Sequence, residues 1–137
     1  MAQDVFIDTN IWLYAFINQS TDFVKQTKAR TLIQNVQPVV SVQVINEICV
    51  NLIKKAKVTE DEISQLIESF YTNYRVIDLT QVILIRASQL RQQYSLSYWD
   101  SLIVASALIA NVTEIYSEDM QHELVISNQI TIINPFK

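Results

Sequence analysis

The run from Leu102 to Ala110, LIVASALIA, constrains the fold of this chain more than any other segment. Every residue in it except Ser106 is apolar, so a helix over this run must be covered by other elements on all sides. Trp99 and Asp100 stand directly before the run. A carboxylate therefore lies at the N-terminus of a buried helix, either as a cap for its free N–H groups or as a functional acid.

Short β-branched runs alternate along the chain with longer segments of helical periodicity. The predicted strands are residues 5–7, 38–41, 75–79, 113–117 and 130–133. The predicted helices are residues 11–17, 22–36, 42–57, 59–71, 80–91 and 99–110. The second of these begins at Thr21 or Asp22, and Thr59 with Glu62 forms a capping box. This alternation predicts a three-layer α/β/α sandwich with a central parallel sheet.

The length of 137 residues predicts one domain, residues 1–137. No apolar run reaches the roughly 18 residues that span a bilayer, and the amino terminus lacks the features of a signal peptide. We therefore expect a soluble cytoplasmic protein without a membrane partner. Cys49 is the only cysteine and His122 the only histidine, which excludes a disulfide framework and a Cys/His zinc site within one chain.

Glycine is absent from the sequence. Turns that need a positive φ must then use asparagine, aspartate or a strained residue. The candidate positions are Asn18, Asn35, Asn111, Asn128 and Asn134. The absence of glycine also excludes the P-loop and the dinucleotide-binding fingerprint.

Four carboxylates are predicted to meet at one edge of the sheet. Asp8 and Asp119 follow two predicted strands, and Glu47 and Asp100 lie near the starts of helices that leave the same edge. Each could be a cap or a solvated residue, but four such coincidences are less plausible than one shared site. Crowded carboxylates stay ionised most readily around a hard cation such as Mg²⁺ or Mn²⁺. That cation can activate water for attack on a phosphodiester without a nucleophilic side chain.

Two other classes of function use similar residues. A phosphoryl-transfer hydrolase would use Asp8 as its nucleophile, but it requires a second acid where this chain has Asn10. A receiver-type signalling module would use Asp78, but the acidic doublet after the first strand and the late lysine are missing. A non-catalytic binding module of the same fold class stays open.

Three segments of the chain resemble the PIN-domain family, and in particular its VapC-type toxins. They are VFIDTNIWLYAF, VSVQVINEICVNL, and YWDSLIVASAL with the following IYSEDMQHE and IINPF. The resemblance covers residues 4–136. It implies a metal-dependent endoribonuclease that is the toxin of a type II toxin–antitoxin pair, with an RNA substrate, a cognate antitoxin protein and a homodimeric state.

The resemblance also implies a set of site residues. The acidic quartet corresponds to Asp8, Glu47, Asp100 and Asp119, and the supporting polar residues to Thr9, Asn10 and Ser117. Asp8 and Asp100 are the best candidates for contact with Mg²⁺ or Mn²⁺, while Glu47 and Asp119 complete the site or orient the attacking water. Glu118 is a further candidate. Many relatives have glycine where this chain has Ser95, Glu123 and Asn128.

Basic and aromatic residues suggest where partners bind. Possible phosphate contacts are Lys25, Lys28, Arg30, Lys54, Lys55 and Lys57, although solvated helix faces explain each of them more simply. Trp12, Tyr14, Phe16 and Phe23 exceed what one thin layer buries easily, which favours a protein partner for some of them.

Overall fold

The computed structural model describes residues 2–17 and 23–137. The strands are β1 (Asp4–Ile7), β2 (Gln37–Ser41), β3 (Arg75–Ile77), β4 (Glu114–Tyr116), β5 (Val125–Ile126) and β6 (Ile130–Ile133). The helices are α1 (Thr9–Phe16), α2 (Phe23–Asn35), α3 (Val42–Ala56), α4 (Glu60–Asn73), α5 (Gln81–Gln93) and α6 (Tyr98–Ile109). The proposed cap of α2 at Thr21 or Asp22 lies outside the described residues.

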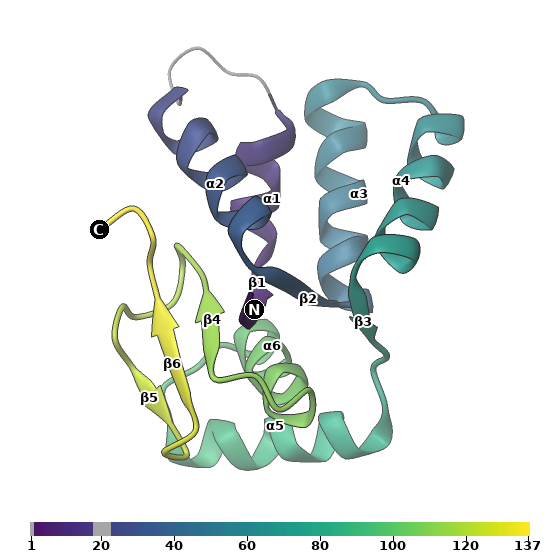
Figure 1. Cartoon of the computed structure of the whole chain (residues 1–137). Coiled ribbons are helices and arrows are strands. Elements are labelled where there is room, and N and C mark those ends of the chain that lie inside the picture. The colour runs from purple at the N-terminus through teal and green to yellow at the C-terminus, as the bar shows by residue number, and fades with distance from the viewer. Residues whose placement is uncertain (1, 18–22) are drawn as a thin grey trace.

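The six strands form one sheet in the order β3-β2-β1-β4-β6-β5. All neighbouring strands are parallel except β5, which pairs antiparallel with β6. Helices α1 to α4 lie on one side of the sheet and α5 and α6 on the other (Figure 1). This is the arrangement that right-handed crossovers produce when the chain first moves from β1 to β3 and then returns to β4. The predicted three-layer sandwich is confirmed, with β5 as an addition.

Helix α6 is buried between the sheet and α5, as its sequence predicts. Residues 101–107 are buried, whereas Ile109 near the helix end is 43% exposed. The cap of α6 is Ser97, whose hydroxyl accepts a hydrogen bond from the Asp100 N–H at 3.1 Å. The interpretation of Asp100 as the helix cap is therefore wrong, because the earlier serine already performs that role.

Other helix starts follow the sequence signals closely. Thr59 and Glu62 form the predicted capping box of α4, and Thr80 caps α5. These local hydrogen bonds satisfy N–H groups that a first helical turn leaves free. The chemistry of the caps therefore sets where the helices begin.

Five described residues other than glycine have positive φ angles: Lys57, Asn111, Glu123, Ser127 and Asn128. The prediction is confirmed for Asn111 and Asn128 and is wrong for Asn35 and Asn134, while Asn18 lies outside the described residues. Within the described residues, no helix is both long and apolar enough to cross a membrane.

The aromatic residues of the first two helices divide between core and surface. Trp12 is fully buried, and its indole N–H donates to the Ile7 carbonyl at 3.1 Å. Phe16 is partly exposed, whereas Phe23 is 66% exposed. Only some of this group is therefore available to a partner.

Candidate active site

Asp8 lies directly after β1 and is almost fully buried. Its backbone N–H donates to the Tyr116 carbonyl of the neighbouring strand β4 at 2.9 Å. Its Oδ1 accepts from the Thr9 N–H at 2.7 Å, and its Oδ2 accepts from the Ser117 hydroxyl at 2.8 Å. Asp8 is the N-cap of α1, so the interpretation of this acid as a helix cap is confirmed. Hydrogen bonds hold both of its carboxylate oxygens in place.

Burial raises the pKa of Asp8 to about 7. The hydrogen bonds from Thr9 and Ser117 act in the opposite direction, and the negative charges of Glu47 and Asp100 add to the increase. The hydrogen bonds thus compensate the burial of the charged carboxylate only in part. A cation beside Asp8 would supply the remaining compensation.

Glu47 lies on α3, and burial raises its pKa. Gln43, one turn earlier, donates from Nε2 to Glu47 Oε1 at 3.0 Å. The Thr9 hydroxyl is close enough to Glu47 to lower the pKa of that carboxyl group. No hydrogen bond of ordinary geometry joins the two side chains, however. Thr9 Oγ1 is therefore buried without a partner among the described residues. An oxygen in this position is suited to a ligand or to bound water.

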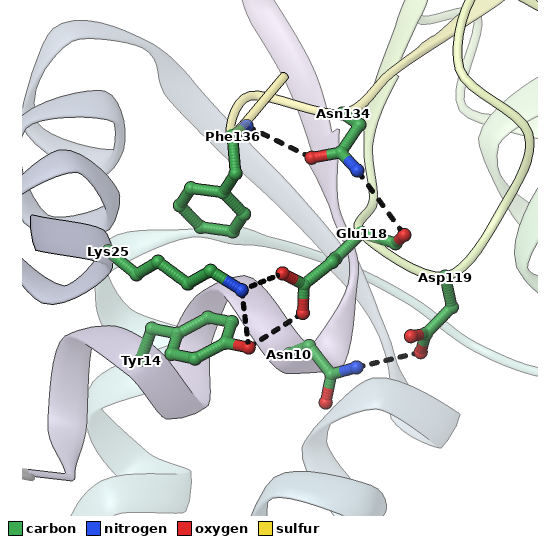
Figure 2. A network of polar contacts seen from close by, with 7 residues as sticks. All are labelled: Asn10, Tyr14, Lys25, Glu118, Asp119, Asn134 and Phe136. Atoms are coloured by element: carbon green, nitrogen blue, oxygen red, sulfur yellow. Dashed lines mark hydrogen bonds and ion pairs between the residues drawn. The ribbon is translucent and has the colours of Figure 1, made fainter. Parts of the chain in front are cut away.

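Asp100 is half-buried in the first turn of α6, and burial raises its pKa. The Ser97 hydroxyl partly offsets this increase, and the charge of Asp119 adds to it. Asp119 follows β4 and is exposed. Its Oδ2 accepts from Asn10 Nδ2 at 2.7 Å (Figure 2). A neutral amide therefore orients Asp119 without cancelling its charge.

Glu118 does not join these acids. Its carboxylate points toward α1 and α2, where Oε1 accepts from the Tyr14 hydroxyl at 2.7 Å and Oε2 pairs with Lys25 at 2.5 Å (Figure 2). Partial burial alone would raise the pKa of Glu118, but these two partners outweigh it and lower the pKa. Because Lys25 already neutralises Glu118, we expect this residue to take no part in the site.

The four predicted acids lie in one electrostatic neighbourhood. The charges of Glu47 and Asp100 raise the pKa of Asp8. Those of Asp100 and Asp119 raise the pKa of Glu47, and that of Asp119 raises the pKa of Asp100. None of them forms an ion pair with a lysine, arginine or histidine in residues 2–17 and 23–137. The sheet edge therefore carries negative charge that these residues leave unbalanced.

These residues fit a small divalent cation held partly through water. All the side-chain atoms that could coordinate the cation are oxygens, and buried Thr9 Oγ1 has no hydrogen-bond partner among the described residues. No three acidic, histidine or cysteine side chains in that part of the chain converge closely enough to hold an ion. Direct contact would then come from one or two carboxylates, which is how proteins commonly bind Mg²⁺. The other acids would act through metal-bound water.

Gln43 contacts the candidate site, although no sequence motif predicted this. Its Nε2 contacts Glu47 and also donates to the Trp99 carbonyl at 3.3 Å, so it links α3 to the start of α6. The available signal was its spacing, because residues four apart share one helix face. Of the basic candidates, Lys25 binds Glu118 and Arg30 Nε donates to the Ala15 carbonyl at 2.9 Å, so both have structural roles.

The sequence matches the PIN domain family model over residues 5–125. No curated protein gives a significant match. The fold is similar to that of a toxin–antitoxin complex from Klebsiella pneumoniae, with a TM-score of 0.71, 21% identity and coverage of 96% of this chain and 97% of that chain.

Two further solved structures share the fold. One is VapC20 from Mycobacterium tuberculosis, described as a toxin that cleaves the sarcin-ricin loop, with a TM-score of 0.67, 17% identity and coverage of 84% and 89% of the two chains. The other is VapBC2 from Rickettsia felis bound to promoter DNA, with a TM-score of 0.64, 17% identity and coverage of 95% and 97%. The family model spans most of the sequence, and the chain therefore belongs to the PIN domain family.

Proposed function

We propose that this protein is a divalent-metal-dependent endoribonuclease and the toxin of a type II toxin–antitoxin pair. One observation carries the proposal: Asp8, Glu47, Asp100 and Asp119 come from four separate segments and interact electrostatically at one sheet edge. Family membership supports nuclease activity. The toxin assignment is supported by the fold shared with toxin–antitoxin proteins.

The chain supplies fixed negative charge and orientation. Ser117 and the Thr9 N–H hold Asp8, Gln43 holds Glu47, and Asn10 holds Asp119. Asp8 and Asp100 are the proposed contacts to Mg²⁺ or Mn²⁺, and Glu47 and Asp119 orient the attacking water. A divalent ion held by these residues would lower the pKa of bound water and offset charge on the phosphate. Hydrolysis then needs no nucleophilic side chain.

A cognate antitoxin and a homodimeric state complete the proposal. The exposed aromatic residues Phe16 and Phe23 give apolar surface on α1 and α2 that a protein partner can cover. We expect a dimer by light scattering and co-purification with a small protein encoded beside it. A monomer at tens of micromolar without a co-purifying partner would contradict this part of the proposal.

Sequencing of RNA ends after brief expression tests activity and target together. Wild-type protein should create new RNA ends, and Asp8→Asn and Asp100→Asn should not, although both variants fold. Purified wild type should lose cleavage in excess chelator and regain it with Mn²⁺. Undiminished cleavage by well-purified Asp100→Asn, or full activity in chelator, would contradict the proposed site.

A covalent mechanism through Asp8 or Asp78 gives a different result with a small acyl phosphate. Stable labelling of either aspartate would favour phosphoryl transfer over nuclease activity. We expect none, because both oxygens of Asp8 already accept hydrogen bonds and Asp78 is an exposed side chain that follows β3.

A further inference from the structure

A pocket of about 380 Å³ adjoins the sheet edge that carries Asp8, Glu47, Asp100 and Asp119, which we call the acidic edge. Its lining residues are Gln43, Asn46, Glu47, Leu79 and Trp99. Glu47 belongs to both the pocket and the acidic cluster, so the two sites are continuous. Trp99, the residue before Asp100, is 63% exposed although tryptophan is usually well covered. Nothing in the proposed hydrolysis requires an indole ring in this position.

Contacts from three helices hold the Trp99 segment in place. The Trp99 ring packs edge-to-face on Tyr98 with 5.2 Å between ring centroids, and the Arg91 guanidinium of α5 lies 4.5 Å from the Tyr98 ring centre. The Trp99 carbonyl accepts a hydrogen bond from Gln43 of α3. The exposed indole is therefore a supported platform at the pocket wall, with a face available for stacking.

Polar groups at the pocket are suited to a ligand with both donors and acceptors. Gln43 Nε2 donates to Glu47 and to the Trp99 carbonyl, and because both partners are acceptors, they fix the orientation of the amide. The Gln43 Oε1 atom then remains buried without a partner among the described residues. Asn46, one turn along α3, lines the pocket with an exposed carboxamide.

We propose that this pocket binds one unpaired nucleobase of an RNA substrate, stacked on Trp99, while the adjoining phosphate lies at the acidic edge. The inference rests on the proposed nuclease function and adds a specificity site to it. An unstacked base matches the pocket because it has a flat apolar face for the indole and a polar edge for amide groups. An apolar protein side chain would instead cover Glu47 without offering it a hydrogen-bond donor, whereas the polar edge of a base can donate.

RNA binding without cleavage tests the pocket directly. In an Asp8→Asn background with Mn²⁺, a short single-stranded RNA should bind about 5- to 150-fold more weakly after Trp99→Ala, which is the range expected for loss of one stacked base. Trp99→Phe should retain much of the affinity. The matched control is Tyr71→Ala, which removes an exposed aromatic side chain from α4 and should leave binding unchanged.

Fluorescence adds a readout that a merely structural role would not change. Trp12 is fully buried, so quenching of tryptophan emission by RNA reports on Trp99. An oligonucleotide with an abasic position next to the cut site should quench less and bind wild type more weakly, but should bind Trp99→Ala as well as intact RNA does. Mn²⁺ affinity should be the same in Trp99→Ala and wild type.

The outcomes separate this inference from the nuclease proposal. If RNA is cleaved but Trp99→Ala binds and selects sites as wild type does, the pocket assignment is overturned and the nuclease stands. If binding depends on the base and on Trp99 but no RNA is cleaved, the nuclease proposal fails and the pocket stands. Conversion of a dimer to a monomer by Trp99→Ala, without loss of RNA affinity per chain, would assign the pocket to a second copy of the protein and overturn the inference.

Discussion

Glu118 and Asp119 are neighbours in the turn after β4, but the structure places them in opposite surroundings. Glu118 is tied to Lys25 and Tyr14, and Lys25 also lies 5.0 Å from the Tyr14 ring centre and 5.3 Å from that of Phe136 (Figure 2). Asp119 has only the neutral Asn10 amide as a side-chain partner among the described residues. The charge of Glu118 is therefore neutralised by a lysine of the same chain. The charge of Asp119 adds to the negative charge of the acidic edge, which no cation of the described residues neutralises.

This contrast separates a structural acid from a functional one. Glu118 also helps to hold the C-terminal segment in place. The backbone carbonyl of Glu118 accepts a hydrogen bond from Asn134 Nδ2 at 3.4 Å, and Asn134 Oδ1 accepts one from the Phe136 N–H at 2.9 Å. The acidic edge has no such internal cation among the described residues. We therefore expect the two regions to respond differently to pH, to substitution and to metal.

The largest difference should be in the pH dependence of stability without metal. The pKa of Asp8 is about 7 in the folded protein against a reference of 3.8, so the folded state binds the proton more tightly. Asp8 then contributes stability that is fully present below about pH 4 and is lost as pH rises to about 7, by up to about 4 kcal/mol. Glu118, whose pKa is lowered, has the opposite sign and loses its contribution as pH falls below its reference of 4.5.

Denaturant unfolding in chelator between pH 4.5 and 8 measures the Asp8 contribution. Wild-type stability should fall with rising pH, and Asp8→Asn should remove most of that slope. Parallel curves for the two proteins would contradict the assignment of the slope to Asp8.

The next difference should be in RNA cleavage. Asp100→Asn should lower the rate by about 100- to 1000-fold, as expected when a charge that acts on the reacting phosphate is removed. Asp119→Asn should lower it by about 10- to 100-fold, as for a group that orients a metal ligand. Glu118→Gln should stay within about threefold of wild type, a change below 1 kcal/mol. Equal losses for Glu118→Gln and Asp119→Asn would remove the distinction between the two acids.

The different roles of Glu118 and Asp119 could be predicted from the sequence only in part, because they depend on partners at different separations along the chain. Asp8 and Asp119 follow β-branched runs, and the parallel sheet then brings them to one edge. The role of Glu118 was not predictable in the same way, because its cation comes from α2, far away in sequence. The difference between adjacent acids depends on tertiary packing, which no local pattern reports.

Local competition explains other errors of prediction. Asp100 looked like a cap because it begins an apolar run, but Ser97 accepts the N–H bond three residues earlier. Strand β5 has only two residues and therefore leaves no periodic signal. Lys57, Glu123 and Ser127 adopt positive φ although their side chains do not favour it. In a chain without glycine, turn geometry selects the conformation at these positions.

The smallest effect should come from the Lys25 ion pair. Its side chains are 38% and 21% exposed, so solvent screens their attraction, and Lys25→Met should cost about 1 kcal/mol or less at pH 7. Lys28→Met on the same helix is a matched control and should change stability negligibly. Chemical denaturation of both variants checks this. A loss of several kcal/mol in Lys25→Met would show that the pair does far more than a partly exposed ion pair does.

Stabilisation by Mn²⁺ tests most directly whether the uncompensated acids form a metal site. Wild type and Glu118→Gln should each gain about 2.7 kcal/mol in unfolding free energy when Mn²⁺ is at 100 times its Kd. Asp100→Asn should be more stable than wild type in chelator, because repulsion is relieved, and should gain clearly less from the ion. A wild-type protein indifferent to Mn²⁺, or an equal gain in Asp100→Asn, would contradict the metal site.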